Sequence, residues 1–81
     1  MAGKYQYWIM IVGYDKLRRK ELNVYFKHLF PKAGLDFYNS IFDQVDGGEP
    51  FRAYESNSRA DAHRTAMTLA TYGAQVEVHP D

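Results

Sequence analysis

The sequence predicts an α+β fold, a two-layer sandwich in which three helices cover one face of a three-stranded sheet. Segments with strand-like and helix-like patterns follow one another in the order strand, helix, helix, strand, helix, strand. The connections between them are short, which favours packing of the three helices on one side of the sheet. With 46% apolar and 16% aromatic residues, the 81-residue chain can fill the core of one domain spanning residues 1–81.

The first strand is predicted over residues 5–14, which are rich in aromatic and β-branched side chains. A strand with one solvated face should alternate apolar and polar residues, but both alternating sets are apolar here. One set consists of Tyr5, Tyr7, Ile9 and Ile11, and the other consists of Trp8, Met10, Val12 and Tyr14. We expect one of these sets to lie on the sheet face that the helices leave open.

Two helices are predicted next, over residues 15–30 and 35–46. Asp15 and Asp36 can cap their starts, Pro31 follows the first helix, and glycines follow the second. The apolar side of the first helix comprises Leu17, Leu22, Tyr25, Phe26, Leu29 and Phe30. The apolar side of the second comprises Tyr38, Ile41, Phe42 and Val45.

The rest of the chain is predicted to form a strand over residues 49–55, a helix over 57–72 and a strand over 74–79. Ser58 and Asp61 resemble a capping box at the start of that helix, and Gly73 is placed as its C-terminal cap. Simple alternation puts Arg52 and Tyr54 on the open sheet face. The same alternation predicts Ala74, Val76 and Val78 inside and Gln75, Glu77 and His79 outside.

Composition and charge narrow the class of protein. Cysteine is absent, and neither a secretion signal nor an apolar run of membrane-span length is visible, which favours a cytoplasmic protein. Residues 1–34 hold seven Lys/Arg and two Asp/Glu, a balance of +5, whereas residues 35–81 hold three and eight, a balance of −5. A uniformly basic nucleic-acid-binding domain would not show this division.

No pattern typical of a catalytic, metal or cofactor site is present in the sequence. His28, His63 and His79 fall on three different predicted elements, and none has a second ligand at metal-binding spacing. No serine stands in a nucleophile-elbow context, and there is no glycine-rich phosphate loop. We therefore expect no enzymatic activity, no cofactor and no metal.

The segment DKLRRK gathers cations at the start of the first predicted helix. The helix dipole already makes that end positive, so the residues Lys16, Arg18, Arg19 and Lys20 oppose local preference. Cations beside free backbone N–H groups suit an anionic partner, which is either an acidic protein surface or a phosphate backbone. The alternative is a solvated charge run, or pairing with the acidic second half of the chain.

The double-sided apolar strand points to an interface on the sheet. An exposed apolar sheet face indicates a binding partner or self-association as a homodimer. Its predicted members are Tyr5, Tyr7, Trp8, Arg52, Tyr54 and Glu77. Sheet aromatics with arginine nearby can also stack RNA bases, so nucleic-acid binding is the alternative function.

The segment SRADAHRTAMTLATYGAQVEV resembles the end of the C-terminal domain of the bacterial ribosomal stalk protein. The family's Asp-Ala pair, Leu, Gly-Ala and Val-Glu-Val strand match this sequence without a gap. The matching residues are Asp61, Ala62, Leu69, Gly73, Ala74, Val76, Glu77 and Val78. Gly34-Leu35 also looks like the family's turn into its second helix, and the Clp protease adaptor is similar in fold and element order.

This resemblance implies a stand-alone copy of the fold that docks other proteins on its first two helices. In the stalk family, basic residues of the first helix face the bound factors, and Lys20 falls near such a position. The second helix is aromatic here, unlike the family's helix rich in Lys, Glu and Ala, and the adaptor's Asn-Asp motif is missing.

We therefore predict a non-catalytic protein-interaction module, adaptor- or inhibitor-like, that binds an acidic protein surface and no membrane. A compact stand-alone domain of this kind would suit a small accessory protein of a phage or mobile element. The predicted partner-binding residues are Lys16, Arg18, Arg19, Lys20, Tyr25, Lys27, Asp36 and Tyr38.

Overall fold

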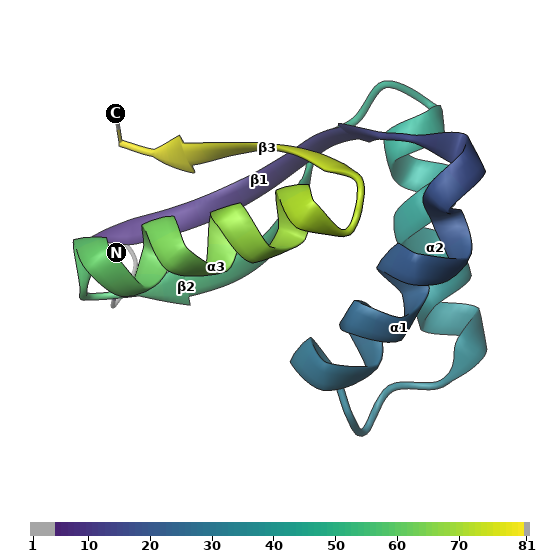
Figure 1. Ribbon diagram of the computed structural model, residues 1–81, viewed down its shortest axis with the longest axis horizontal. Coiled ribbons are helices and arrows are strands. Elements are labelled where there is room, and N and C mark those ends of the chain that lie inside the picture. Colours follow the sequence, from purple (N-terminus) through teal and green to yellow (C-terminus); the bar gives the residue numbers. More distant parts are fainter. Residues whose placement is uncertain (1–4, 81) are drawn as a thin grey trace.

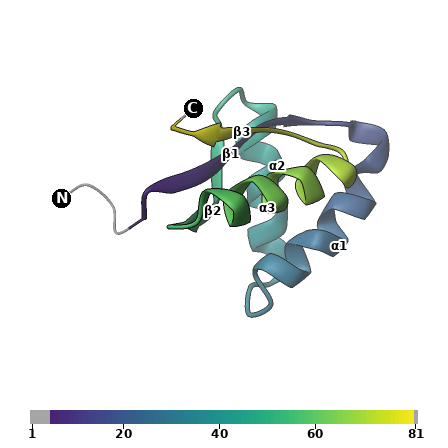
Figure 2. The ribbon, with the colours of Figure 1, turned by 60° about the vertical axis from the view of Figure 1, so that its left-hand side comes forward.

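The computed structural model describes residues 5–80 and confirms the predicted fold class. Three antiparallel strands form one sheet in the order β2-β1-β3, with bounds β1 Tyr7–Tyr14, β2 Phe51–Ser56 and β3 Ala74–His79. The helices are α1 Arg19–Leu29, α2 Leu35–Asp46 and α3 Arg59–Thr71. They cover one face of the sheet, with α3 along the strands and the α1–α2 pair at one end (Figures 1 and 2).

The core lies between the helices and the sheet. Ile9 and Ile11 of the central strand are almost completely buried, so they and their alternating partners face the helices. The core side chains that the helices contribute include Leu22, Phe26, Tyr38, Ile41, Phe42, Val45, Ala66 and Leu69. The small residues of α3 let that helix lie close to the strands.

The first predicted helix is interrupted at its start. Residues Lys16–Arg18 form a 3₁₀ turn, η1, in which the Asp15 Oδ1 accepts the Leu17 N–H at 2.9 Å. The α-helix begins only at Arg19. Because of this turn, the Leu17 side chain points into solvent and is 95% exposed. The prediction that Leu17 belongs to the apolar side of the helix is therefore wrong.

A register shift between Ile9 and Met10 changes which residues of β2 reach the open face. Arg52 pairs with Met10, but Tyr54 pairs with Ile9, so Tyr54 faces the helices. Its hydroxyl donates to the Asp61 carboxylate of α3 at 2.7 Å. The prediction that Tyr54 lies on the open face is wrong, because alternation along the strand breaks at the bulge.

A second register shift, between Ile11 and Gly13 in the pairing with β3, changes which residues at the other end of β1 face the helices. Tyr14 pairs with Ala74 on the helix side, where its ring contacts Phe42 edge-on. The open face therefore carries Trp8, Met10 and Val12 from β1, Arg52 and Glu55 from β2, and Gln75, Glu77 and His79 from β3. Tyr7 pairs with buried Ser56 on the helix side, contrary to its predicted place at the open face, and Tyr5 precedes the strand.

Several helix ends differ in detail from the predicted caps. Ser58 caps α3 by accepting the Asp61 N–H at 3.2 Å, but the Asp61 carboxylate turns to Tyr54 and Arg64 instead of completing a capping box. Gly34 holds the N-cap position of α2, and Asp36 lies exposed in its first turn without capping it. The remaining bounds agree with the prediction within two residues, apart from the start of α1.

Candidate docking groove

A groove of about 590 Å³ runs between the start of α1 and the middle of α2. We call it the α1–α2 groove. Its lining residues are Lys16, Leu17, Arg19, Lys20, Asn23, Asn39 and Phe42. Three of the seven are cations and two are amides, so the groove combines positive charge, hydrogen-bonding groups and apolar surface.

The floor of the groove is held by Arg19 and Phe42. The Arg19 guanidinium lies 4.3 Å from the centre of the Phe42 ring, and its Nη2 donates to the Asn39 Oδ1 at 3.3 Å. Phe42 is itself 1% exposed and packs against Tyr14 and Phe26. Arg19 is thereby fixed in orientation by a cation–π contact between the two helices.

The rim of the groove carries more exposed groups. Leu17 is apolar and almost fully exposed, because the 3₁₀ turn directs it outward. Lys16 approaches Asp46 only at 3.9 Å, with its side chain 79% exposed. Among residues 5–80, Lys20 has no carboxylate partner within 4.0 Å. These lysines can therefore turn toward a bound anion with little loss of existing contacts.

Asn23 gives the groove an unsatisfied polar atom. Its Oδ1 is buried and has no hydrogen-bond partner within the part of the chain that the structure describes. A buried acceptor in this state costs about 1–3 kcal/mol. No sequence pattern marked Asn23 or Asn39, because each is an ordinary polar residue on a helix until the helices come together.

The predicted docking residues do not all gather at this groove. Lys16, Arg19 and Lys20 line it, whereas Lys27 is exposed at the far end of α1 and Asp36 is exposed outside it. Arg18 turns the other way: its Nε donates to Glu21 and its Nη2 donates to the Thr71 carbonyl. Arg18 thus joins η1 to the end of α3.

The two tyrosines predicted to bind a partner make contacts within the domain instead. Tyr38 is 4% exposed, and its hydroxyl donates to the carbonyls of Phe30 and Ala33 at 2.7 and 3.2 Å. This burial removes Tyr38 from any docking surface. Tyr25 is half-buried and stacks on Tyr72 at the end of α3, with 5.1 Å between the ring centres, and burial raises the pKa of its hydroxyl.

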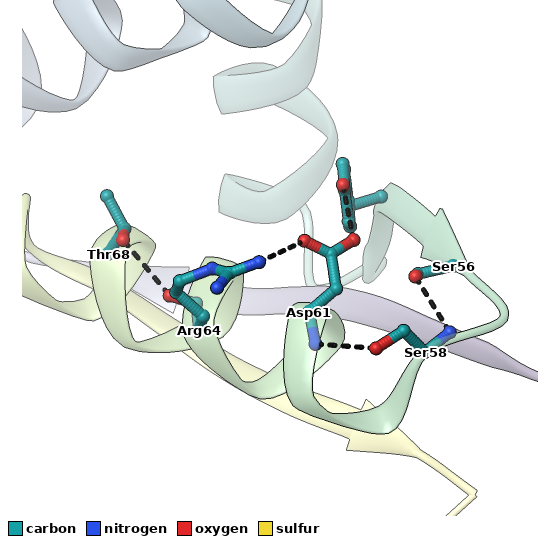
Figure 3. A network of polar contacts seen from close by, with 6 residues as sticks. Ser56, Ser58, Asp61, Arg64 and Thr68 are labelled. Carbon is teal, nitrogen blue, oxygen red and sulfur yellow. Dashed lines mark hydrogen bonds and ion pairs between the residues drawn. The ribbon is translucent and has the colours of Figure 1, made fainter.

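A second polar cluster joins β2 to the start of α3 (Figure 3). The Asp61 carboxylate accepts from the Tyr54 hydroxyl at 2.7 Å and from the Arg64 Nη2 at 3.0 Å. The hydrogen bond from Tyr54, followed by that from Arg64, lowers the pKa of Asp61, and the same bond raises the pKa of Tyr54. Ser56 accepts the Ser58 N–H at 3.0 Å, so the cluster fixes a turn and a helix start.

Within residues 5–80, no group of three His, Cys, Asp or Glu side chains is arranged to hold a metal ion. His28, His63 and His79 lie on α1, α3 and β3. None of the helices in these residues is both long and apolar enough to cross a membrane. No protein-family model matches the chain, and the curated proteins gave no match to it.

Proposed function

We propose that this chain is a non-catalytic protein-interaction module, of adaptor or inhibitor type, that docks an acidic segment of another protein in the α1–α2 groove. The observation that carries the proposal is the composition of the groove: an Arg19 held in orientation, two exposed lysines on the rim and an exposed Leu17 around one cavity. A stalk-like domain would dock its partners on the same two helices.

The groove suits a segment that combines carboxylates with one apolar side chain. Carboxylates would meet the lysines and Arg19, and mutual charge attraction would speed association. The apolar side chain would cover Leu17, whose exposure leaves a large aliphatic surface to bury.

Nucleic-acid binding is supported less well by this arrangement. A single-strand site needs aromatic rings and cations on one surface. Here the basic turn lies in the helical layer, whereas Trp8, the aromatic side chain of the open face, lies on the other side of the sheet. The Trp8 ring also already contacts the Arg52 guanidinium, at 4.6 Å, and the His79 ring, at 5.9 Å.

The test is a pull-down from lysate with the tagged chain, with and without nuclease, using three forms of the protein. The groove variant is Lys16→Glu/Lys20→Glu, and the matched control is Lys27→Glu/Lys32→Glu, which reverses two exposed lysines away from the groove. Arg18 is left unchanged, because its contacts to Glu21 and Thr71 hold η1 in place.

We expect a protein that the wild type and the control retain after nuclease treatment and that the groove variant loses. The purified partner should then bind at least tenfold more weakly to a Leu17→Ser variant, since an apolar hot spot contributes more than about 1.4 kcal/mol. Equal loss in the groove variant and the control would exclude the groove. Capture that disappears with nuclease would replace protein docking by nucleic-acid binding.

A further inference from the structure

The open face of the sheet carries its charges in a checkerboard. At the level of Trp8, the flanking residues are Glu55 on β2 and His79 on β3. At the level of Met10, the flanking residues are Arg52 on β2 and Glu77 on β3. Residues directly opposite one another in an antiparallel ladder share a face, so all six side chains lie on this surface. The two carboxylates therefore alternate with the Arg52 guanidinium and the His79 imidazole, both along each edge strand and across the sheet.

Such a pattern is complementary to itself. When two copies of a sheet pack face to face about a twofold axis parallel to β1, the β2 edge of one copy lies over the β3 edge of the other. Arg52 then meets the partner's Glu77, and Glu55 meets the partner's His79, twice each by symmetry. The same pattern also matches about a twofold axis perpendicular to the strands, because Arg52 then meets the partner's Glu55. The charges alone therefore do not choose between the two axes.

The apolar centre of the face selects the axis. With the axis parallel to β1, Trp8, Met10 and Val12 lie over the same residues of the partner, and all three are covered. An axis perpendicular to the strands, placed to match the charges, would set Trp8 over Met10 and leave Val12 over the exposed Gln6. Val12 is 39% exposed in the single chain, so the parallel axis buries more apolar surface.

We propose that the chain forms a homodimer by face-to-face packing of the two open sheet faces about a twofold axis parallel to β1. Aligned sheets pack about 10 Å apart with their strands within about 30° of each other, which this arrangement satisfies. The intramolecular contacts already hold the charges in position: Arg52 lies 3.8 Å from Glu55, and His79 lies 3.0 Å from Glu77. The residues that line the α1–α2 groove belong to the helical layer, on the other side of the sheet, so the groove stays accessible in the dimer.

The experiment measures molar mass by sedimentation equilibrium, with charge-reversal variants that separate the two possible axes. Arg52→Glu alone places like charges against each other about either axis. Arg52→Glu/Glu77→Arg restores opposite charges only about the parallel axis. Arg52→Glu/Glu55→Arg restores them only about the perpendicular axis. Thermal unfolding of each variant checks that the fold is retained.

We expect a dimer for the wild type, at least a tenfold weaker dimer for Arg52→Glu, recovery in Arg52→Glu/Glu77→Arg and no recovery in Arg52→Glu/Glu55→Arg. Trp8 is the one tryptophan of the sequence, so its fluorescence should shift on dilution through the same concentration range. A wild type that stays monomeric at about 1 mM would overturn the proposal. Recovery by the other double variant, or by neither, would overturn the parallel-axis dimer.

The dimer and the docking function can fail separately. Lys16→Glu/Lys20→Glu should leave the molar mass unchanged, because both lysines lie in the helical layer. Arg52→Glu should leave partner capture at the groove unchanged.

Discussion

Replacing three glycines by alanine, one at a time, tests how the chain turns from α3 into β3. Gly73 has φ +102°, and an added Cβ would lie 3.1 Å from the Cβ of Arg18. Gly48 has φ +88° but has no neighbouring atom within 4 Å of such a Cβ. Gly34 has an ordinary φ of −99° and is equally open. The three positions therefore separate backbone strain from crowding.

The expected costs follow from these differences. Gly48→Ala should lower the free energy of unfolding by about 1–2 kcal/mol, because an L-residue is disfavoured at positive φ. Gly73→Ala should lower the free energy of unfolding by the same amount. The contact of the new Cβ with Arg18 should lower it by about 1 kcal/mol or more in addition, which is the usual cost of crowding a packed position. Gly34→Ala should change the free energy of unfolding by less than about 1 kcal/mol, since alanine restricts the unfolded chain but is less favourable than glycine at an N-cap.

The assay is urea denaturation followed by circular dichroism, with thermal unfolding as a second measure. A loss of 1 kcal/mol should lower Tm by about 4–8 °C in a domain of this size. The three variants should rank in the order Gly34→Ala, Gly48→Ala, Gly73→Ala, from most to least stable. Equal stability of the last two would refute the reasoning that η1 packs tightly against the turn at Gly73.

Three further predictions concern stability. Tyr38→Phe should lower the free energy of unfolding by about 1–3 kcal/mol by denaturant titration, since two carbonyls lose their donor. Tyr5→Phe is the exposed control and should change it by less than about 0.5 kcal/mol. Leu17→Ser should likewise be neutral, whereas Leu22→Ala should cost about 2–5 kcal/mol. A destabilising Leu17→Ser would contradict the outward 3₁₀ turn. The pKa of Asp61 is lowered in the folded state, so its stabilisation is complete above the unfolded value of 3.8 and is lost as pH falls through the folded pKa. Acid titration of Asp61→Asn should show a smaller loss below about pH 4 than the wild type, and equal curves would exclude this role.

Only part of the α1–α2 groove could be predicted from residue patterns in the sequence. The clustering of Lys16, Arg19 and Lys20 is visible in the sequence, because the cations stand together in one helical turn. Asn39 and Phe42 reach the same groove from a helix some 20 residues later, and no local pattern connects them to the first. Tyr38 was predicted on the apolar side of its helix and also among the partner-binding residues, but it is buried and its hydroxyl donates to two carbonyls between α1 and α2.

The sequence by itself determined the elements, their order and the fold class, because hydrophobic period, caps and turn residues act over a few neighbouring positions. The sequence also showed that both faces of the first strand are apolar, so a second apolar surface was expected beside the one that the helices cover. Only the tertiary structure decided which face stays open. The two register shifts, one in the pairing of β1 with β2 and one in its pairing with β3, turn Tyr54 and Tyr14 toward the helices. They leave Arg52, Glu55, Glu77 and His79 around Trp8 and Met10. A shift of one residue in pairing reverses the side on which every later side chain lies, and that pairing depends on strands far apart in the chain.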